Sequence, residues 1–346
     1  MAETMKAYRI AEEHGPGGWA EVEVPHAGPG EVLLKNAAAG LCRTDLELMD
    51  HGAVFYPWSG AYTIGHETAG HVVEVGDGVV GLAEGDAVLV HSNTSCGRCR
   101  NCFAGRDNFC LQRPPIYGYA DNGGLAPYMV ARQRDVVHLG SLDPKVAAPL
   151  ADAGATAYGS FLDIRPYLED DGYVAVIGVG GVGGMAVQLL RTLSSVHVIA
   201  VDLPDRLDIA RANGAQHVVA SSPSARDEIM EITGGRGVQA SIDIVGSDDT
   251  LALCAGITAS LGAVSLVGLA GGTLPFNFMS LQWGVRLFSS TTCSLGNLSK
   301  LVSIVEREQL TVQHQAFAFD DVEKGYDALR AGKVAGRAVI DFSLDG

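Results

Sequence analysis

Residues 173–193 read YVAVIGVGGVGGMAVQLLRTL, and this stretch decides the fold of the second half of the chain. It opens with a β-strand pattern, passes through a glycine-rich turn that includes Val182, and continues as an apolar helix. In this turn Gly178 permits a tight bend, Gly180 lets the backbone approach a pyrophosphate, and Gly183 permits close packing of the helix on the strand. The helix N-terminus presents its positive end to the phosphates. The motif therefore predicts a dinucleotide site within a βαβ unit.

A carboxylate follows the glycine turn at the end of the next strand-like run. Asp202 ends the run HVIAVD, where it can accept hydrogen bonds from both ribose hydroxyls of a dinucleotide. Its charge repels a 2′-phosphate, so this residue favours NAD over NADP as the cofactor. Arg206 lies four residues later and could hold such a phosphate, which leaves the alternative open.

Strand patterns alternate with helical patterns throughout this part of the chain. This alternation predicts an α/β domain with a parallel, doubly wound sheet of the Rossmann type. The predicted strands cover residues 173–177, 196–201, 240–245 and 263–267, and the predicted helices cover residues 183–193, 203–213 and 226–233.

The N-terminal part has a different pattern, in which short apolar runs alternate with clusters of glycine and proline from residue 6 to about residue 137. Such a pattern is typical of a small, mostly antiparallel β domain with long loops. After residue 293 the chain reads as a return to that domain, with helices at 298–307 and 322–331 and strands at 315–317 and 337–342. We therefore expect one domain from residues 1–153 and 294–346, and a second domain from residues 154–293.

The composition is that of a folded, acidic protein. Its 346 residues exceed what one hydrophobic core usually organises, and 24 Lys plus Arg against 40 Asp plus Glu give a net charge of −16. That charge repels phosphate backbones and anionic membrane surfaces. The N-terminus lacks the apolar core of a signal peptide, and no segment reaches membrane-spanning length. We expect a cytoplasmic protein with neither nucleic acid nor membrane among its partners.

Four of the seven cysteines crowd into one short segment with the spacing C-x2-C-x2-C-x7-C. They are Cys96, Cys99, Cys102 and Cys110. Four thiolates can close a tetrahedral zinc shell with no open position, which is typical of a structural site. An iron–sulfur cluster is disfavoured by the long last gap and by the absence of a following proline. Cys254 and Cys293 stand alone in apolar stretches, and we expect both to be buried, unreactive thiols.

Three further motifs complete the pattern. Residues 42–45 read CRTD, residues 65–70 read GHETAG with Gly76 after them, and residues 148–154 read APLADAG. With the glycine turn and the cysteine lobe, they resemble the zinc-containing medium-chain alcohol dehydrogenases over essentially the whole chain. The resemblance implies a GroES-like β domain with a structural zinc lobe, joined to the Rossmann domain. It also implies reversible hydride transfer between an alcohol or ketone and NAD, with two zinc ions per subunit.

The same resemblance implies that Cys42, His66 and Asp152 hold the catalytic zinc. A thiolate, an imidazole and a carboxylate leave one position open for water or alcohol, as a Lewis-acid zinc requires. Many relatives carry cysteine where this chain has Asp152, and an oxygen ligand makes the metal harder. A metalloprotease-like pair of His66 and His71 on one helix is disfavoured, because their spacing is five rather than four. We expect His71 to lie in a strand.

Further residues take roles by resemblance. Glu67 is similar to the family's acidic neighbour of the metal, and Asp45 to the carboxylate that orients the zinc-binding histidine. Thr44 is similar to the hydroxyl that relays the proton of the alcohol, and Glu47 or His51 could complete that relay. The implied cofactor contacts are Arg43 and Arg337 at the pyrophosphate, Thr156 at the nicotinamide, and Val267 with Gly268 at its carboxamide edge.

Apolar residues suggest the class of substrate. Phe55, Trp58 and Leu295 are expected to line the pocket, which favours a hydrophobic secondary or aromatic alcohol or ketone. Two alternatives remain open, namely a polyol or sugar dehydrogenase of the same fold and a nonenzymatic zinc and NAD binder acting as a redox sensor. The apolar run at residues 285–290 could pair with a second copy, and the resemblance implies a homodimer or homotetramer.

Overall fold

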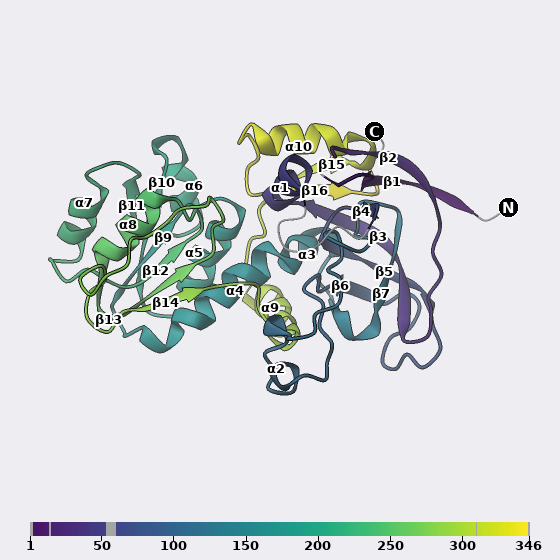
Figure 1. Ribbon diagram of the computed structural model, residues 1–346, viewed down its shortest axis with the longest axis horizontal. Helices are drawn as coiled ribbons and strands as arrows, with labels where there is room; N and C mark the ends of the chain where they lie inside the picture. The colour runs from purple at the N-terminus through teal and green to yellow at the C-terminus, as the bar shows by residue number, and fades with distance from the viewer. Residues whose placement is uncertain (1–2, 14, 53–59, 309, 345–346) are drawn as a thin grey trace. The chain divides into compact units, whose positions relative to one another are not determined.

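The computed structural model describes residues 3–13, 15–52, 60–308 and 310–344, and the chain divides into two compact units. One unit comprises Met1–Asp152 and Ser294–Gly346, and the other comprises Ala153–Cys293. We call the first the β unit and the second the α/β unit (Figure 1). Among the described residues, no helix is both long enough and apolar enough to cross a bilayer.

The α/β unit is built on a six-stranded parallel sheet in the order β11-β10-β9-β12-β13-β14. The strands are β9 (Tyr173–Ile177), β10 (His197–Asp202), β11 (His217–Ala220), β12 (Val238–Asp243), β13 (Thr258–Leu266) and β14 (Arg286–Ser289). The helices are α4 (Ala153–Ile164), α5 (Gly181–Leu193), α6 (Leu207–Ala212), α7 (Ala225–Ile232) and α8 (Asp248–Ile257). The winding reverses between β9 and β12, and the glycine turn follows β9 at this switch point, where open α/β sheets bind ligands.

The α/β unit agrees with the predicted strand and helix alternation and differs in its details. Helix α6 is shorter than predicted, because Pro204–Arg206 form a 3-10 turn before it. Helices α4 and α8 and strand β11 were not predicted. The start of α8 depends on Ser247 and Thr250, which bond reciprocally in a capping box without the usual acidic partner.

The β unit contains a seven-stranded sheet in the order β15-β16-β3-β5-β6-β8, with β7 also paired to β3, and a three-stranded sheet in the order β2-β1-β4. The strands are β1 (Thr4–Ile10), β2 (Gly17–Glu23), β3 (Glu31–Leu41), β4 (Tyr62–Thr63), β5 (Glu67–Val75), β6 (Ala87–Val90), β7 (Tyr128–Arg132), β8 (Val136–His138), β15 (His314–Ala318) and β16 (Arg337–Asp341). The helices are α1 (Arg43–His51), α2 (Arg100–Phe103), α3 (Pro144–Ala147), α9 (Leu295–Glu308) and α10 (Val322–Arg330). All pairs are antiparallel except β15 with β16.

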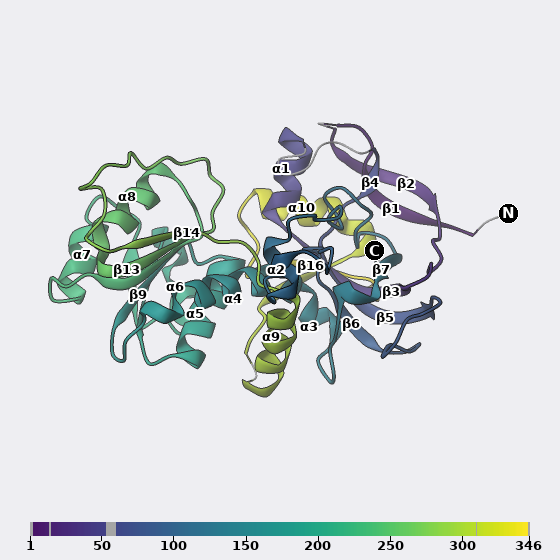
Figure 2. The same ribbon diagram turned by 60° about the horizontal axis from the view of Figure 1, so that its bottom comes forward.

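The C-terminal segment joins the N-terminal sheet, as the sequence predicts. Strand β16 pairs with β3, and α10 lies against α1 in both views (Figures 1 and 2). A buried apolar cluster that includes Leu41, Leu48 and Tyr326 fills the space between these elements. Segments almost three hundred residues apart are therefore packed around the end of β3.

Candidate active site

Two neighbouring strands bring the first two predicted metal ligands together. Strands β3 and β5 are antiparallel and place Gly40 opposite Glu67, so the end of β3 lies beside the start of β5. Cys42 follows β3 as the N-cap residue of α1, and His66 directly precedes β5. The third ligand, Asp152, follows a 3-10 turn (Ala148–Ala151) that packs against both strands.

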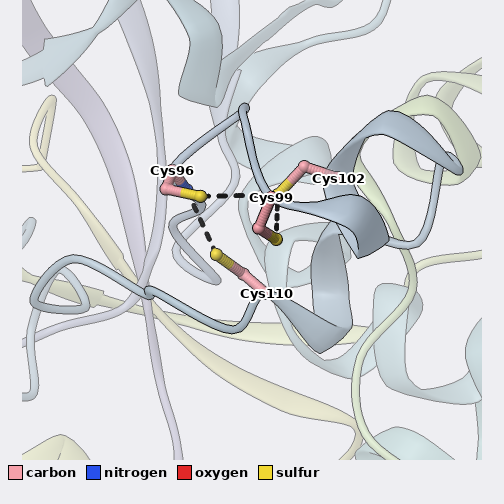
Figure 3. A group of neighbouring side chains, drawn as sticks. All are labelled: Cys96, Cys99, Cys102 and Cys110. Atoms are coloured by element: carbon pink, nitrogen blue, oxygen red, sulfur yellow. Dashed lines mark hydrogen bonds between the residues drawn. The ribbon is translucent and has the colours of Figure 1, made fainter.

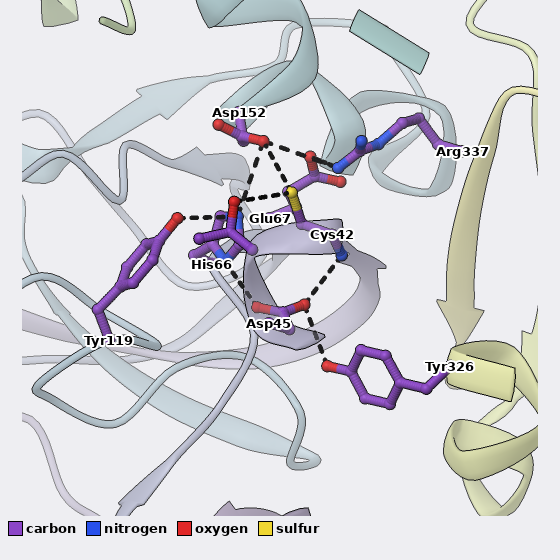
Figure 4. Close-up of polar contacts among 9 residues, drawn as sticks. Cys42, Asp45, His66, Glu67, Tyr119, Asp152, Tyr326 and Arg337 are labelled. Carbon is purple, nitrogen blue, oxygen red and sulfur yellow. Dashed lines mark hydrogen bonds and ion pairs between the residues drawn. The ribbon is translucent and has the colours of Figure 1, made fainter. Parts of the chain in front are cut away.

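The three side chains converge within the β unit (Figure 4). Their donor atoms all lie within 4.8 Å of one another. The Sγ of Cys42 lies 3.4 Å from Oδ2 of Asp152, and Nε2 of His66 lies 3.7 Å from the same oxygen. A thiolate, an imidazole and a carboxylate at these separations fit one four-coordinate zinc ion with one position open. His71 lies within β5 with an exposed side chain, so it belongs to a strand as expected.

A buried carboxylate fixes the orientation of His66. Oδ1 of Asp45 lies 3.0 Å from Nδ1 of His66, and its Oδ2 accepts a bond of 2.9 Å from the amide of Cys42. The hydroxyl of Tyr326 donates to the same Oδ2 at 3.1 Å. Because Nδ1 is held in this way, Nε2 is the nitrogen directed at Asp152. The hydroxyl of Thr44 lies 3.6 Å from Sγ of Cys42.

Neighbouring charges shift the pKa values of two of the predicted ligands. Burial alone lowers the pKa of His66, but Tyr119, Asp45 and Asp152 outweigh it and hold that pKa well above its usual value. Burial likewise raises the pKa of Asp152, but the hydrogen bond and charge of His66, with the charge of Arg337, hold it well below its usual range. The imidazole and the carboxylate therefore stabilise each other's charged forms. Zinc and a proton compete for Nε2, since a metal ligand must be deprotonated.

Glu67 and Arg337 form a buried ion pair behind the ligands. Nη2 of Arg337 bonds to Oε1 of Glu67 and lies 3.7 Å from Oδ2 of Asp152. Burial raises the pKa of Glu67 to about 7, although the charge of Arg337 opposes this rise. Gly40 is required here, because a Cβ at that position would lie 1.8 Å from Oε2 of Glu67. Arg337 therefore lies close to two carboxylates of the β unit. Its expected contact with the pyrophosphate stays a prediction.

Three further predicted residues lie on α1. Arg43, which is predicted at the pyrophosphate, is exposed at the first residue of that helix. Glu47 and His51 are also exposed, and their side chains pair at 3.6 Å across one helical turn. Phe55 and Trp58 lie outside the described residues. Leu295, the third predicted pocket residue, begins α9 with a half-buried side chain.

Two tyrosines of the site were missed by the sequence analysis. Tyr119 lies in an irregular loop, with its hydroxyl 3.4 Å from Nε2 of His66 and its ring centroid 4.7 Å from that of the imidazole. Tyr326 comes from α10 and bonds to Asp45. Neither has a spacing rule that connects it to the ligands, because both meet the site only through the tertiary fold.

The bond from Tyr326 leads to a testable expectation. Tyr326→Phe keeps the packed ring and removes one hydrogen bond to the carboxylate that orients His66. Losing a partner behind a zinc ligand typically weakens metal affinity, here by about tenfold. Competition for Zn2+ with a chromophoric chelator measures the change. Tyr117→Phe is the matched control, since that phenol bonds to Asp135 instead, and equal affinities of both variants would contradict the expectation.

The four clustered cysteines form a second donor set in the β unit (Figure 3). Sulfur atoms of Cys99 and Cys102 lie 3.5 Å apart, and those of Cys96 and Cys102 lie 4.0 Å apart. Zinc–sulfur bonds of about 2.3 Å place the sulfurs of a tetrahedral site about 3.8 Å apart, so the set fits a closed zinc site. Asp107 of this lobe accepts a bond of 3.0 Å from the amide of Leu295. Cys254 and Cys293 are buried, as expected.

The carboxyl edge of the α/β sheet carries the predicted cofactor residues. Gly178 has φ +85°, and a Cβ on Gly183 would lie 1.9 Å from the carbonyl oxygen of Gly178. A Cβ on Gly180 would meet no atom within 4 Å, so the backbone is open there. Asp202 ends β10 and its Oδ2 accepts a bond of 2.6 Å from the amide of Val179. The carboxylate is therefore drawn to the glycine turn.

The remaining predicted cofactor residues also belong to the α/β unit. Thr156 is buried in the first turns of α4, and Arg206 ends the 3-10 turn before α6. Val267 follows β13, where its amide and that of Gly268 both donate to the carbonyl of Asp243. Parallel strands end at a common edge, so Val267, Gly268 and Asp202 share the edge of the glycine turn.

Comparisons with known proteins agree with this architecture. Residues 28–141 match the alcohol dehydrogenase GroES-like domain, and residues 181–307 match the zinc-binding dehydrogenase domain. The chain is 33% identical to the NAD-dependent alcohol dehydrogenase of Sulfolobus acidocaldarius, covering 97% of this chain and 99% of the relative. It is 32% identical to the D-arabinose 1-dehydrogenase (NADP(+)) of Saccharolobus solfataricus, covering 92% of this chain and 93% of the relative.

A solved structure gives the same result. The alcohol dehydrogenase of the hyperthermophilic archaeon Aeropyrum pernix aligns with a TM-score of 0.89 and 34% identity, covering 97% of this chain and 99% of that one. The fold is thus a GroES-like β domain with a Rossmann domain, as the sequence predicts. The chain belongs to the zinc-containing medium-chain alcohol dehydrogenase family.

Proposed function

We propose that the chain is a zinc-dependent oxidoreductase that transfers hydride reversibly between a hydrophobic secondary or aromatic alcohol and NAD. The convergence of Cys42, His66 and Asp152 carries this proposal, because these three donors leave one position open on a zinc ion. The four-cysteine lobe has no position left for a substrate and takes the structural role. The β unit is accordingly the catalytic domain and the α/β unit the NAD-binding domain.

The residues around the open position have separate tasks. Bound zinc supplies Lewis acidity that lowers the pKa of an alcohol hydroxyl. Thr44 accepts the proton of that hydroxyl and passes it on, since its side chain lies beside Cys42 at the donor set. Asp45 keeps Nε2 of His66 directed at the donor set. Arg337 balances the buried charge of Glu67.

The decisive experiment combines metal analysis with a substrate panel. We expect two zinc ions per chain and NADH formation with hydrophobic secondary alcohols such as 1-phenylethanol. The relative named D-arabinose 1-dehydrogenase supports a second candidate, a sugar dehydrogenase. A higher kcat/KM for D-arabinose, glucose or sorbitol than for any hydrophobic alcohol would favour that candidate. No turnover of either class by a fully metallated protein would contradict the proposed function.

Cofactor choice depends on Asp202 in this proposal. Asp202→Ala removes both the charge that repels a 2′-phosphate and the acceptor for the amide of Val179, whereas Asp202→Asn keeps an acceptor without the charge. We expect both variants to lower the NAD-to-NADP ratio of kcat/KM by about tenfold or more. Only the alanine variant should also lose stability in the glycine turn. An unchanged ratio in both variants would assign the discrimination to another residue, with Arg206 the first to test.

We further propose a cytoplasmic homodimer or homotetramer. Strand β14 is an edge of the parallel sheet, as expected for residues 285–290, and the segment before it carries large exposed apolar side chains. They are Leu269, Phe276, Phe278, Met279 and Trp283. Exposed apolar area of this kind marks an interface, and pairing of β14 with its copy would cover the edge. Light scattering of the purified protein tests the assembly, and a monomer at micromolar concentration would contradict it.

A further inference from the structure

The phenol of Tyr119 lies on the metal-facing side of His66. Asp45 holds Nδ1 of the imidazole at 3.0 Å, so only Nε2 is available for a metal. The hydroxyl of Tyr119 lies 3.4 Å from this Nε2 (Figure 4). A phenol that supported His66 from behind, as Asp45 does, would lie at the opposite nitrogen. The hydroxyl of Tyr119 therefore lies on the side of His66 that faces the metal site, whereas Asp45 lies on the opposite side.

The distances place the phenol oxygen at the edge of the donor set. It lies 3.4 Å from Nε2 of His66, while Oδ2 of Asp152 lies 3.7 Å from the same nitrogen. Donors of one four-coordinate zinc are separated by about this length. Tyr119 is thus one donor spacing from His66, at the nitrogen that also faces Asp152. The hydroxyl of Thr44 lies beside Cys42 of the same donor set. The hydroxyls of Thr44 and Tyr119, which come from separate elements, therefore both lie next to a predicted ligand.

Local structure holds the ring in this place. The ring packs on the imidazole at an interplanar angle of 33°. The amide of Tyr119 donates to the carbonyl of Ile116 at 3.2 Å, and the neighbouring Gly118 takes φ +79° in the turn. A Cβ on Gly118 would lie 2.6 Å from the backbone of Gly65, so the loop is fitted closely against the residue before His66. The phenol is therefore positioned before any substrate arrives, which reduces the entropy cost of using it.

Metal binding changes what the hydroxyl can bond to. Once Nε2 gives its lone pair to a metal, it no longer accepts a hydrogen bond from the phenol. A phenol is protonated at neutral pH and keeps its capacity to donate. An oxygen that enters the open position retains lone pairs and offers a new acceptor beside Tyr119. A bond to an oxygen that gains negative charge is stronger than a bond to a neutral one, so it favours the charged state of the substrate.

We propose that Tyr119 is a catalytic residue that donates a hydrogen bond to the substrate oxygen in the open position. This inference rests on the proposed function and deepens it. In alcohol oxidation the bond stabilises the oxygen as it loses its proton to Thr44, and in ketone reduction it polarises the carbonyl. Tyr119 itself keeps its proton in both directions, so Thr44 remains the relay.

A pair of probes separates this role from a structural one. Cobalt(II) replaces zinc in the wild type, Tyr119→Phe and Tyr117→Phe, and its visible spectrum reports occupation of the open position. The first probe is 2,2,2-trifluoroethanol, whose oxygen can still accept a bond when it is coordinated. The second is imidazole, whose coordinating nitrogen has no lone pair left. Tyr117→Phe makes the same change two residues away, where the hydroxyl lies 3.3 Å from Asp135.

We expect Tyr119→Phe to weaken trifluoroethanol binding by about tenfold and to leave imidazole binding within about twofold of the wild type. Tyr117→Phe should change neither. With zinc, Tyr119→Phe should lower kcat more than it raises KM, since the bond strengthens as charge develops.

Three results would overturn the assignment. If Tyr119→Phe weakened the binding of both probes equally, Tyr119 would be a structural support of the metal site. If it weakened the binding of neither, Tyr119 would not bond to the substrate oxygen. A changed cobalt spectrum of Tyr119→Phe without either probe would make the phenol a ligand. The proposed function fails separately, because a wild type that takes up no cobalt at Cys42, His66 and Asp152 lacks the metal site altogether.

Discussion

Replacing Asp152 with alanine is expected to remove one of two zinc ions per chain and to reduce alcohol oxidation by about a thousandfold or more. Of the three donors that converge among the described residues, the change leaves Cys42 and His66, and two ligands hold zinc too weakly at a catalytic site. Asp152 is partly exposed, so its truncation creates little internal cavity. The α/β unit and the cysteine lobe should keep their structure. Atomic absorption, kcat/KM and the thermal unfolding profile measure the three consequences separately.

Asp152→Cys is the matched control for this expectation. A thiolate is also a zinc ligand, so this variant should keep two zinc ions and much of the activity. This variant loses the Asp152 oxygen that lies 3.7 Å from Arg337. The ion pair of Arg337 with Glu67 does not involve that oxygen and should remain. Full activity of Asp152→Ala, or full activity of any preparation with one zinc per chain, would contradict the two-metal account.

The sequence was most informative where function depends on local spacing. The strand Tyr173–Ile177 and the glycine turn after it are fixed by neighbouring residues, and both were predicted with their correct bounds. The four cysteines are likewise a local pattern, and they come together as one donor set. Such motifs can be read from the sequence because the chain itself brings their residues together, with little help from the tertiary fold.

Residues that depend on distant packing were harder to assign. Tyr326 is 281 residues from Asp45, and only the pairing of β16 with β3 and the packing of α10 bring them together. Tyr119 reaches His66 through an irregular loop for which no periodicity exists. The resemblance predicts Arg337 at a pyrophosphate, and its pairing with Glu67 depends on the register of β16 against β3. Side-chain direction at a strand end follows from register, which a single sequence does not specify.

The two glycines of the cofactor turn should respond to alanine in opposite ways. At Gly180 the backbone has φ −80° and ψ −150°, about 30° beyond the β region open to alanine, and the added methyl would meet no atom within 4 Å. The fold should tolerate Gly180→Ala at a small cost. The methyl would occupy the space into which a pyrophosphate must come, so we expect NAD to bind about a hundredfold more weakly, with a fall in melting temperature much smaller than that of Gly183→Ala.

At Gly183 the result should be reversed. The added Cβ would lie 1.9 Å from the carbonyl oxygen of Gly178, and a backbone atom in a tight turn cannot move aside as a flexible side chain can. Overpacking of this kind costs about 3 kcal/mol, equivalent to a fall of roughly 10 °C in melting temperature. Calorimetry measures the change in stability, and NADH titration measures the change in cofactor binding. Gly296→Ala is the control, because its methyl also would meet no atom within 4 Å and Gly296 lies in α9, far along the chain from the turn. A loss of stability in Gly180→Ala as large as that of Gly183→Ala, or normal stability in Gly183→Ala, would contradict these roles, because the first glycine leaves room for the cofactor and the second for the helix itself.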